Sequence, residues 1–385
     1  MNCPKCGNQN PDDAELCTSC NSPLAQPPQP VETVKVKTSR LAITSMILAI
    51  LSPFAFFLAV FFGIKMLALI SIFAAMLALI FGIISLVRIG LSAGRRTGKA
   101  FVSIGIAILA VFFSLIFLQA VLPRTRSRAF RMVCGSNLAG LGRAMLIYAN
   151  DYDNNYPRAG GQDTIWQPKI NDWQAKDRRT AFFLKSDGTG GSATISSSLY
   201  LLVRYTDVSL KSFICKSGDL RAKIFNPAKY GVRDIELEDL WDFGPEPAKH
   251  YSYSYHIPYG PFPLNMTTSE PGQAVAADRN PWLDPYTDTT GFRWDDQAKT
   301  GPPEDIKRCQ KGNNGFHQRE GQNVLFMDNH VYFEKLPFCG VDDDNIYTYW
   351  NGSDIQQGAP PTLTSQPADR LDSLLVNEQP KEDKK

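Results

Sequence analysis

The chain has 385 residues, a length that indicates two or three domains. Its 40 basic and 38 acidic side chains give a formal net charge of +2, so no strong overall field points to nucleic acid. The apolar residues are unevenly distributed, because residues 41–123 hold no acidic side chain and only five basic ones: Lys65, Arg88, Arg95, Arg96 and Lys99. This concentration of apolar sequence excludes a simple soluble enzyme.

The first 20 residues contain four cysteines in the spacing C-x2-C-x10-C-x2-C: Cys3, Cys6, Cys17 and Cys20. Four thiolates at this spacing predict a closed tetrahedral Zn²⁺ site. Gly7 and Asn21 each follow the second cysteine of a pair, where the backbone must turn tightly. Little else in residues 1–24 could form a core, so metal binding would supply most of the folding energy. Two disulfides are the alternative interpretation.

This segment resembles the short bacterial zinc-ribbon family, whose pattern CPxCG…CxxCG it matches apart from Asn21. The resemblance covers residues 1–24 and implies a structural zinc ion. Lys5 is the only basic residue in this stretch, and the acidic residues at 12, 13 and 15 oppose contact with phosphates. We therefore expect no nucleic-acid partner, and a ribbon that docks a protein.

Residues 25–40 are rich in Pro and polar side chains and predict a linker. Three uncharged runs follow, at residues 41–64, 66–87 and 100–123. At about 1.5 Å per residue each run exceeds the roughly 30 Å of the hydrocarbon layer, and each is apolar on all sides, so we expect three membrane spans rather than core helices. Residues 41–99 also resemble the two-helix membrane module often found behind bacterial zinc ribbons.

The basic residues predict the orientation of the spans. They gather before the first span and between the second and third, whereas Lys65 alone separates the first from the second. The positive-inside bias therefore places the N-terminus in the cytoplasm, which suits a site made of four thiolates. Three crossings of a bacterial inner membrane would then place the C-terminal domain outside. The arginines that follow residue 123 oppose this, but a long domain translocates largely regardless of charge.

The third span is expected to continue as one long helix to residue 150, with a kink at Pro123. Its apolar residues beyond the proline recur at steps of 4, 4, 3, 4 and 3, the period of a helix: Phe130, Cys134, Leu138, Leu141, Met145 and Tyr148. An Asn/Asp-rich stretch closed by Pro157 ends this stripe.

An α+β domain is expected after this helix. Strands are predicted at residues 251–256, 274–278 and 323–336, the last being a hairpin with a two-residue turn of positive φ at Asp328-Asn329. Residues 351–385 are rich in Pro, Ser, Gln and charge, so we expect a disordered tail.

Four blocks resemble pilin-like proteins of the type II secretion pseudopilin class. They are CGSNLAGLGRAMLIYANDYDNNYP (134–157), SFICKSGD (212–219), VAADRN (275–280) and HQREGQNVLFMDNHVYF (317–333). The last resembles the prepilin-type processing-associated His-x9-Asp-Gly signature, although ten residues separate His317 from Asp328 and Asn329 stands in the Gly place. The resemblance implies a pilin-like fold over residues 100–350, with a long N-terminal helix and an antiparallel sheet. The Glu of a prepilin helix is absent from the third span, so we expect a fixed membrane protein.

Four cysteines lie in the outer domain, where an oxidising space would favour disulfides: Cys134, Cys215, Cys309 and Cys339. Three pairings are possible. Our hypothesis is that Cys134–Cys215 ties the long helix to the sheet and that Cys309–Cys339 brackets the hairpin. Buried thiols are the alternative.

A metal site in the outer domain is a weaker hypothesis. His317, Asp328 and His330, with Asp278, could form a 2-His-carboxylate site. The interpretation that we favour is that Asp328 fixes the turn and the histidines bond to the backbone. Residues 150–155 and 342–345 offer oxygens for Ca²⁺, but the first lacks the Gly and Glu of an EF-hand, and a helix end and a solvated loop are the better interpretations.

Three functions fit these features. We expect a non-enzymatic integral membrane protein in an envelope-assembly, secretion-type or surface-binding role, with the lipid bilayer and envelope proteins as partners. A metal-dependent extracytoplasmic enzyme using His317, Asp328 and His330 is one alternative. A transmembrane sensor, in which a sugar or peptide bound outside shifts the spans and the ribbon, is the other.

Overall fold

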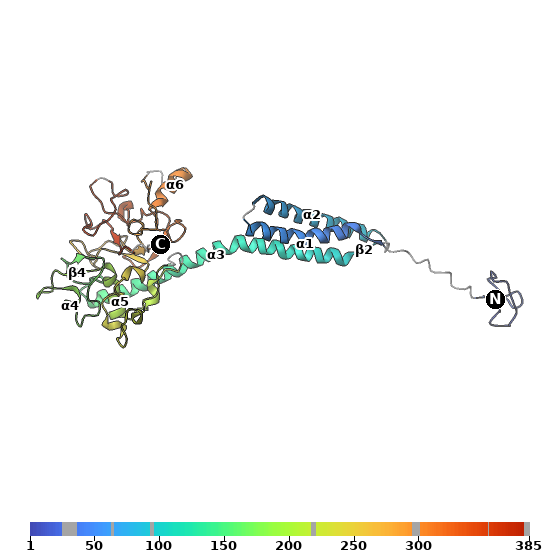
Figure 1. Ribbon diagram of the computed structural model, residues 1–385, viewed down its shortest axis with the longest axis horizontal. Coiled ribbons are helices and arrows are strands. Elements are labelled where there is room, and N and C mark those ends of the chain that lie inside the picture. Colours follow the sequence, from blue (N-terminus) through green and yellow to red (C-terminus); the bar gives the residue numbers. More distant parts are fainter. Residues whose placement is uncertain are drawn as a thin grey trace. The chain divides into compact units, whose positions relative to one another are not determined.

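The chain forms two compact units, Met1–Val121 and Leu122–Lys385, here called the N-terminal and C-terminal units (Figure 1). The computed structural model describes residues 1–24, 37–62, 65–92, 96–216, 221–294, 301–352 and 354–380. Most of the predicted linker therefore lies outside the described residues. The side chains of residues 118–127 also lie outside the described residues. The kink predicted at Pro123 falls within this stretch.

Three helices dominate the N-terminal unit after the cysteine-rich segment. They are α1 (Arg40–Phe61), α2 (Lys65–Gly90) and the first part of α3 (Lys99–Asp151). Each contains a stretch long and apolar enough to cross a membrane, at Arg40–Ala59, Leu69–Gly90 and Lys99–Phe117. The three predicted spans are therefore present as candidate membrane helices.

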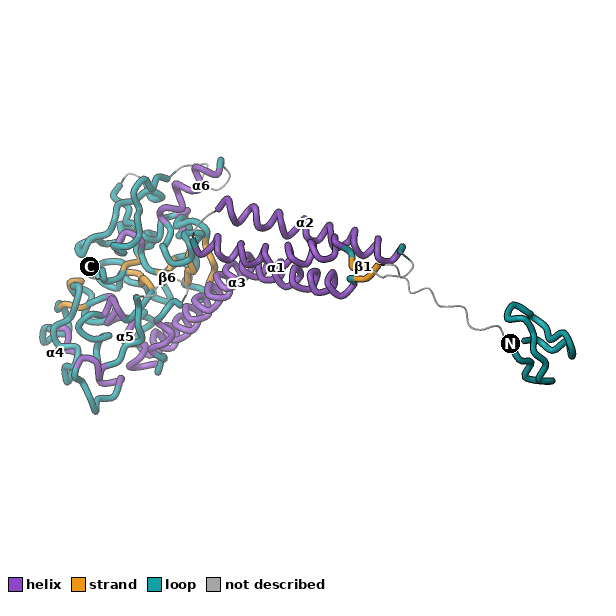
Figure 2. Tube along the Cα trace, turned by 45° about the vertical axis from the view of Figure 1, so that its right-hand side comes forward, coloured by secondary structure: helices purple, strands orange, loops and turns teal. Residues whose placement is uncertain are grey.

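The three helices lie side by side (Figure 2). They contact one another through small residues and aromatic rings. Ala49, Ala75 and Ala78 are buried between them, and the rings of Phe56 and Phe112 meet edge-on with centroids 5.3 Å apart. Larger apolar side chains on all three helices point outward and are exposed. This is the arrangement that lipid favours, because small residues let helix backbones approach while apolar side chains meet the acyl chains. Two short strands, β1 (Lys37–Thr38) and β2 (Arg96–Thr97), pair in parallel beside the helices.

The C-terminal unit combines the end of α3 with an antiparallel sheet of order β8-β7-β6-β5-β9. Its strands are β5 (Tyr253–His256), β6 (Ala274–Asp278), β7 (Gln322–Phe326), β8 (Val331–Glu334) and β9 (Leu375–Val376). The remaining elements are α4 (Arg178–Phe182), α5 (Ile195–Thr206), α6 (Pro303–Cys309) and the parallel pair β3 (Ile165–Trp166) and β4 (Ser192–Ala193). This confirms the α+β class and the antiparallel sheet, with the strand at residues 274–278 as predicted.

The predicted helical stripe of α3 forms part of the core of the C-terminal unit. Five of its six members are at most 3% exposed, and only Phe130 is partly buried. Two glycines let the helix approach the hairpin closely. A Cβ at Gly135 would lie 3.1 Å from Asn323 Oδ1, and one at Gly142 would lie 2.8 Å from Leu325 Cδ1.

The hairpin turn differs from the predicted two-residue turn. Phe326 N–H donates to His330 O and Asn329 N–H donates to Phe326 O, which leaves three residues in the loop. Only Asn329 has positive φ, at 69°, as in a type I turn followed by a left-handed residue. Asn tolerates that conformation, which explains how Asn329 can take the last position of the loop.

The tail predicted to be disordered is, in its described part, built into the fold. Strand β9 pairs with β5 and closes that edge of the sheet, so the compact unit does not end at residue 350. Glu378 is 2% exposed and accepts hydrogen bonds from Trp166 Nε1 (3.0 Å), Ile195 N (2.6 Å) and Ser196 N (3.1 Å), and from the hydroxyl of Tyr251. It thereby caps the N-terminus of α5 from 182 residues away in sequence. Composition alone could not reveal this contact. The last five residues lie outside the described ones.

A second carboxyl group lies at the same helix terminus. Asp242 accepts a hydrogen bond from the Thr194 hydroxyl at 2.6 Å and one from Phe243 N at 2.8 Å. Burial raises the pKa of Asp242 to about 8, and the charge of Glu378 adds to the rise. Burial also raises the pKa of Glu378. The folded protein therefore retains protons here that the unfolded chain releases.

We predict that the C-terminal unit loses stability as the pH rises between about 4 and 8. In this interval the folded Asp242, with a pKa of about 8, stays protonated while the unfolded carboxyl, near 3.8, is ionised. Because the folded state binds more protons, its free energy of unfolding falls with rising pH. All six tryptophans lie in this unit, so tryptophan fluorescence of the full chain in detergent can follow its unfolding. Asp242→Asn should reduce the slope and raise the stability at pH 8; an unchanged slope would contradict the assignment.

Candidate functional site

The four N-terminal cysteines converge on one point. Their Sγ atoms all lie within 4.8 Å of one another, with Cys3 and Cys20 at 3.6 Å and Cys6 and Cys17 at 3.5 Å. Cys3 and Cys17 are buried and pack with Leu24 in a small apolar cluster. This is the spacing of ligands around one ion rather than of two disulfides, since all four are thiols.

Two matching backbone turns hold the cysteines in place. Gly7 N–H donates to Cys3 O and Asn21 N–H donates to Cys17 O, each at 2.9 Å. Gly7 has a φ of 71° and Asn21 one of 49°, the left-handed conformation expected at both positions. Asn10 braces the second turn, because its Oδ1 accepts from Thr18 N at 2.9 Å. The two turns therefore direct the cysteines of each pair toward a common centre.

The pKa values of two of the thiols shift in opposite directions. The backbone N–H of Ser19 lowers the pKa of Cys17 to about 6. The pKa of Cys6 is raised to about 12: a backbone hydrogen bond from Asn8 opposes the rise, but neighbouring thiols outweigh it. The thiolate of Cys17 thus forms more readily than that of Cys6. A cation would favour the thiolate at both residues, because it stabilises all four thiolates at once.

A second cluster lies buried in the C-terminal unit. His317 Nε2 is 3.0 Å from Asp278 Oδ2, and both side chains are fully buried. Asn323 joins them, with its backbone N donating to Asp278 Oδ2 at 2.8 Å and its Nδ2 lying 3.2 Å from His317 Nε2. Cys215 Sγ lies 3.9 Å from the same nitrogen. The cluster connects β6 to β7 and to the loop that carries the histidine.

The predicted 2-His-carboxylate site is not assembled. Asp328 and His330 pair with each other in the hairpin turn, where they are about half exposed, whereas His317 and Asp278 are buried. Within the described residues, two groups could hold a metal, the N-terminal thiols and the Cys134–Cys215 sulfurs with His317, and neither includes Asp328 or His330. Asp328 fixes the turn by accepting from His330 N at 3.1 Å, as the favoured interpretation expected. The rings of His317 and His330, which that interpretation paired with the backbone, instead pair with the carboxylates of Asp278 and Asp328.

The two predicted disulfides have different outcomes. Cys134 and Cys215 are joined, with Cα atoms 5.2 Å apart, and tie α3 to the chain that leads into β5. Cys309 and Cys339 are not joined by a disulfide, so that pairing is wrong. Their side chains pack into different apolar clusters, and Cys309 Sγ lies 3.1 Å from Arg293 O.

The two candidate calcium loops serve the fold. Asp153 and Asn154 adopt positive φ and end α3, as the helix-stop interpretation predicts. The loop at residues 342–345 is less solvated than expected. Asp344 is 3% exposed and accepts from Ser373 N at 2.8 Å, which fastens the C-terminal segment.

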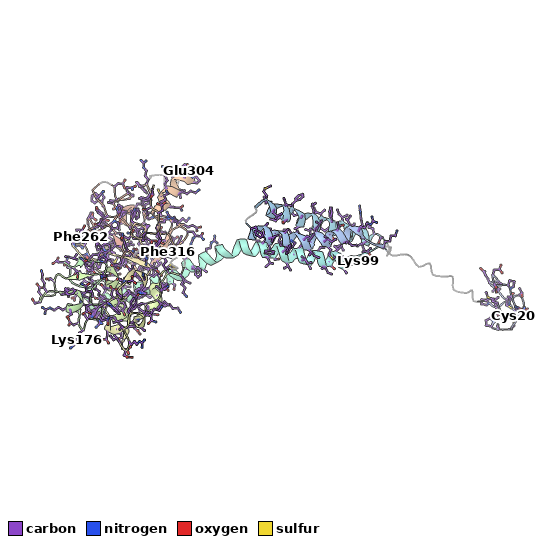
Figure 3. The ribbon with its side chains drawn as sticks, in the orientation of Figure 1. Cys20, Lys99, Lys176, Phe262, Glu304 and Phe316 are labelled. Carbon is purple, nitrogen blue, oxygen red and sulfur yellow. A yellow bond between two sulfur atoms is a disulfide. The ribbon has the colours of Figure 1, made fainter. Side chains whose placement is uncertain are left out.

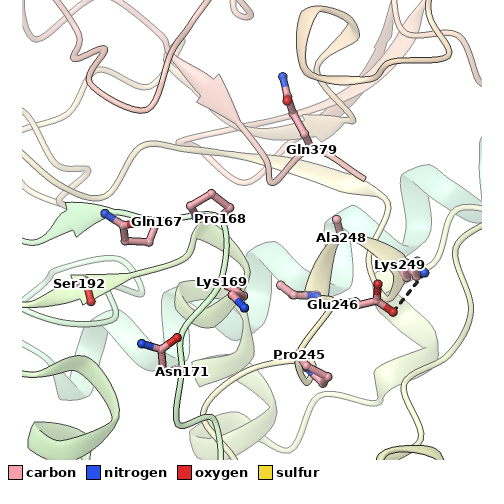
Figure 4. Close-up of a pocket in the computed structure, with 11 residues that line it drawn as sticks. Gln167, Pro168, Lys169, Asn171, Ser192, Pro245, Glu246, Ala248, Lys249 and Gln379 are labelled. Atoms are coloured by element: carbon pink, nitrogen blue, oxygen red, sulfur yellow. Dashed lines mark hydrogen bonds and ion pairs between the residues drawn. The ribbon is translucent and has the colours of Figure 1, made fainter. Parts of the chain in front are cut away.

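Cavities in the C-terminal unit bring together residues that the sequence did not single out. One, of about 410 Å³, lies between the segment at 167–171 and the turn at 245–249 (Figure 4). Lys169 and Asn171 line one wall, and the ion pair of Glu246 and Lys249, at 3.1 Å, lines the other. A second, of about 860 Å³, includes Trp282. Each cavity is formed by segments that are distant in the sequence, so no local motif predicts it.

A comparison with protein families identifies residues 2–24 as a zinc-ribbon domain, which confirms the prediction for this segment. Neither the curated proteins nor the solved structures contain a match to the chain. Metal binding by the four cysteines is thus the best-supported chemistry of this protein.

We predict that the full chain binds one zinc ion per molecule through these thiols. Cys17→Ser should abolish stoichiometric zinc, measured by elemental analysis of the protein purified in detergent. The C-terminal unit should keep its tryptophan fluorescence in this variant, because all six tryptophans lie there. Zinc retained by Cys17→Ser at full stoichiometry would contradict the four-cysteine site. Ser19→Ala, which keeps the backbone donor, is the matched control.

We predict that Cys134→Ala with Cys215→Ala lowers the free energy of unfolding of the C-terminal unit by about 2–5 kcal/mol, because the bond closes a long loop with a sequence separation of 81. Denaturant unfolding followed by tryptophan fluorescence measures this change. Peptide mapping of the denatured wild type should find Cys309 and Cys339 alkylated without reduction. Alkylation of Cys134 and Cys215 under the same conditions would show that the bond is absent.

Proposed function

We propose that this chain is a non-enzymatic integral protein of the bacterial inner membrane, which anchors a pseudopilin-like binding domain outside the cell membrane and carries a zinc-loaded ribbon in the cytoplasm. The observation that carries the proposal is the contrast in cysteine chemistry between the two ends of the chain. Four thiols cluster in residues 1–24, whereas Cys134 and Cys215 form a disulfide.

The two chemistries belong to different compartments. A site of four thiols persists where the surroundings keep sulfur reduced, and a structural disulfide persists where they are oxidising. Three candidate spans separate the two ends, and an odd number of crossings leaves them on opposite sides. The basic residues before α1 and between α2 and α3 support a cytoplasmic N-terminus.

The pseudopilin-like assignment is supported by the arrangement of α3 and the sheet. The helix that supplies the third candidate span also supplies Leu138, Leu141 and Met145 to the core of the C-terminal unit, where they pack beside the antiparallel sheet. Because the third span lacks the acidic residue of a prepilin, we propose a fixed anchor in envelope assembly, secretion or surface binding rather than a filament subunit.

The ribbon is proposed to dock a protein. Its surface exposes the apolar side chain of Leu16 beside acidic residues, while its own core is limited to Cys3, Cys17 and Leu24. An exposed apolar side chain on so small a domain favours a protein contact over a phosphate backbone.

The test is the accessibility of single cysteines to a membrane-impermeant maleimide in intact bacterial spheroplasts. Lys176 is exposed in the C-terminal unit (Figure 3) and Asp13 is exposed in the ribbon. We predict that Lys176→Cys is labelled in intact spheroplasts and that Asp13→Cys is labelled only after permeabilisation. Labelling of Lys176→Cys only after permeabilisation would place both ends in the cytoplasm and contradict the proposal.

A further inference from the structure

One edge of the five-stranded sheet is open. Strand β8 lies at the end of the order β8-β7-β6-β5-β9 and, among the described strands, pairs with β7 alone. The opposite edge is the two-residue strand β9, whereas β8 has four residues. An edge strand presents unpaired backbone N–H and C=O groups, on which another strand can pair. Strand β8 is therefore the longer of the two edges that this sheet offers to an added strand.

The register of the hairpin shows which backbone groups of β8 are open. Phe326 N–H donates to His330 O, and bonded residue pairs alternate along an antiparallel ladder, so Tyr332 is the next residue of β8 that bonds to β7. Val331 and Phe333 fall between the bonded positions, and their N–H and C=O groups point away from β7. Within the described part of the chain, no hydrogen bond engages these four groups. A second strand would thus meet two donors and two acceptors.

Two hollows flank this edge, one on each side of the strand. The first, of about 610 Å³, lies between β8 and α3 and is lined by Val331 and Phe333 from the strand. The second, of about 810 Å³, is lined by Tyr332 and Glu334, whose side chains point to the opposite face. The apolar residues on the far walls are Met132, Gly135 and Ala139 in the first hollow, and Ile306, Leu336 and Phe338 in the second.

The hollow beside α3 carries an open positive charge. Arg131 lies over the ring of Phe333, 4.5 Å from its centroid, and pairs with Glu320. Arg128 lines the same hollow and is exposed, and no carboxylate among the described residues pairs with it. One cation is therefore compensated within the fold and the other is not, which favours an acidic residue in the occupant.

The shape of the edge specifies an extended peptide. The open groups of Val331 and Phe333 lie about 7 Å apart along the strand, which is the spacing at which a second β-strand repeats its own donors and acceptors. Main-chain hydrogen bonds would hold such a peptide, and its side chains would point alternately into the two hollows. A small molecule cannot complement both the ladder and the two hollows.

We propose that the edge of β8 binds an extended peptide segment of a partner protein by strand addition, with apolar side chains in the two hollows and an acidic side chain at Arg128. The inference gives the proposed binding role its class of partner and rests on that role. Peptide binding is measured on the purified chain, so its failure would leave the anchoring and the orientation of the spans, which maleimide labelling tests, unaffected.

The experiment is the selection of random heptapeptides, displayed on phage, by the full chain in lipid nanodiscs, with counter-selection on empty nanodiscs. We expect enriched sequences that combine apolar residues with an acidic one. A synthetic copy of an enriched peptide is then methylated at one backbone nitrogen at a time. Because every second N–H of an added strand faces β8, methylation should weaken binding about 10-fold or more at alternate positions and little between them.

Variants of the chain test the same edge from the other side. Val331→Pro removes one open donor at a position whose N–H does not serve the ladder, so it should keep the native tryptophan fluorescence while weakening binding about 10-fold or more. Val331→Thr keeps the N–H and the β-branched shape and is the matched control, expected to bind within about 2-fold of the wild type. Arg128→Glu should also weaken binding, whereas Arg143→Glu, at an exposed position of α3 outside the hollow, should not.

Four results would overturn the proposal. One is the absence of any peptide enriched over empty nanodiscs. Another is sensitivity to N-methylation without alternation, which would show that side chains alone are recognised. The third is wild-type affinity in Val331→Pro, or loss of its native fluorescence, since either would contradict the outward direction of this N–H. The fourth is a dimer of the chain, detected by light scattering in detergent and dissociated by Val331→Pro, which would assign the edge to a second copy.

Discussion

Helix α3 must satisfy two environments with one continuous backbone, and the rest of the chain is arranged around this constraint. After Lys99 its first part is uncharged and apolar on all sides, which suits a membrane span, because lipid offers no water to bond to open backbone groups. Its last part carries a narrow stripe from Cys134 to Tyr148 that becomes the core of the C-terminal unit. One element therefore contains both a candidate membrane span and part of the core of the C-terminal unit.

The sulfur chemistry follows the same division. In the ribbon, two tight turns present four thiols to a common centre, which is the arrangement of ligands around one cation. In the C-terminal unit, the disulfide fastens α3 to the segment before β5, next to the buried pair of His317 and Asp278. Here His317, Asp278 and Asn323 contact one another, so two of the residues that looked like metal ligands connect β6 with β7 and the histidine loop.

The C-terminal segment changes how the fold is understood. Strand β9 covers the edge of β5 and becomes the edge strand itself, and an edge of two residues offers little backbone for pairing with another chain. Glu378 caps the N-terminus of α5, and Asp242 is a second carboxyl group at the same terminus. Both are buried, and burial raises the pKa of each. Glu378 caps the helix although it is distant in the sequence. The two buried carboxyl groups lower the stability of the folded protein at alkaline pH, because they are then ionised more easily in the unfolded chain.

Local patterns were sufficient for the ribbon, the three candidate spans, the α3 stripe and strand β6, because cysteine spacing, uncharged length and helical period each act over a few residues. The hairpin turn was placed correctly but assigned the wrong type, since the number of loop residues depends on the pairing of Phe326 with His330. The order in the tail, the separation of Cys309 from Cys339 and the two hollows beside β8 were decided by tertiary structure alone. Each depends on side chains brought together from distant segments, and composition records which residues are present but not which of them meet.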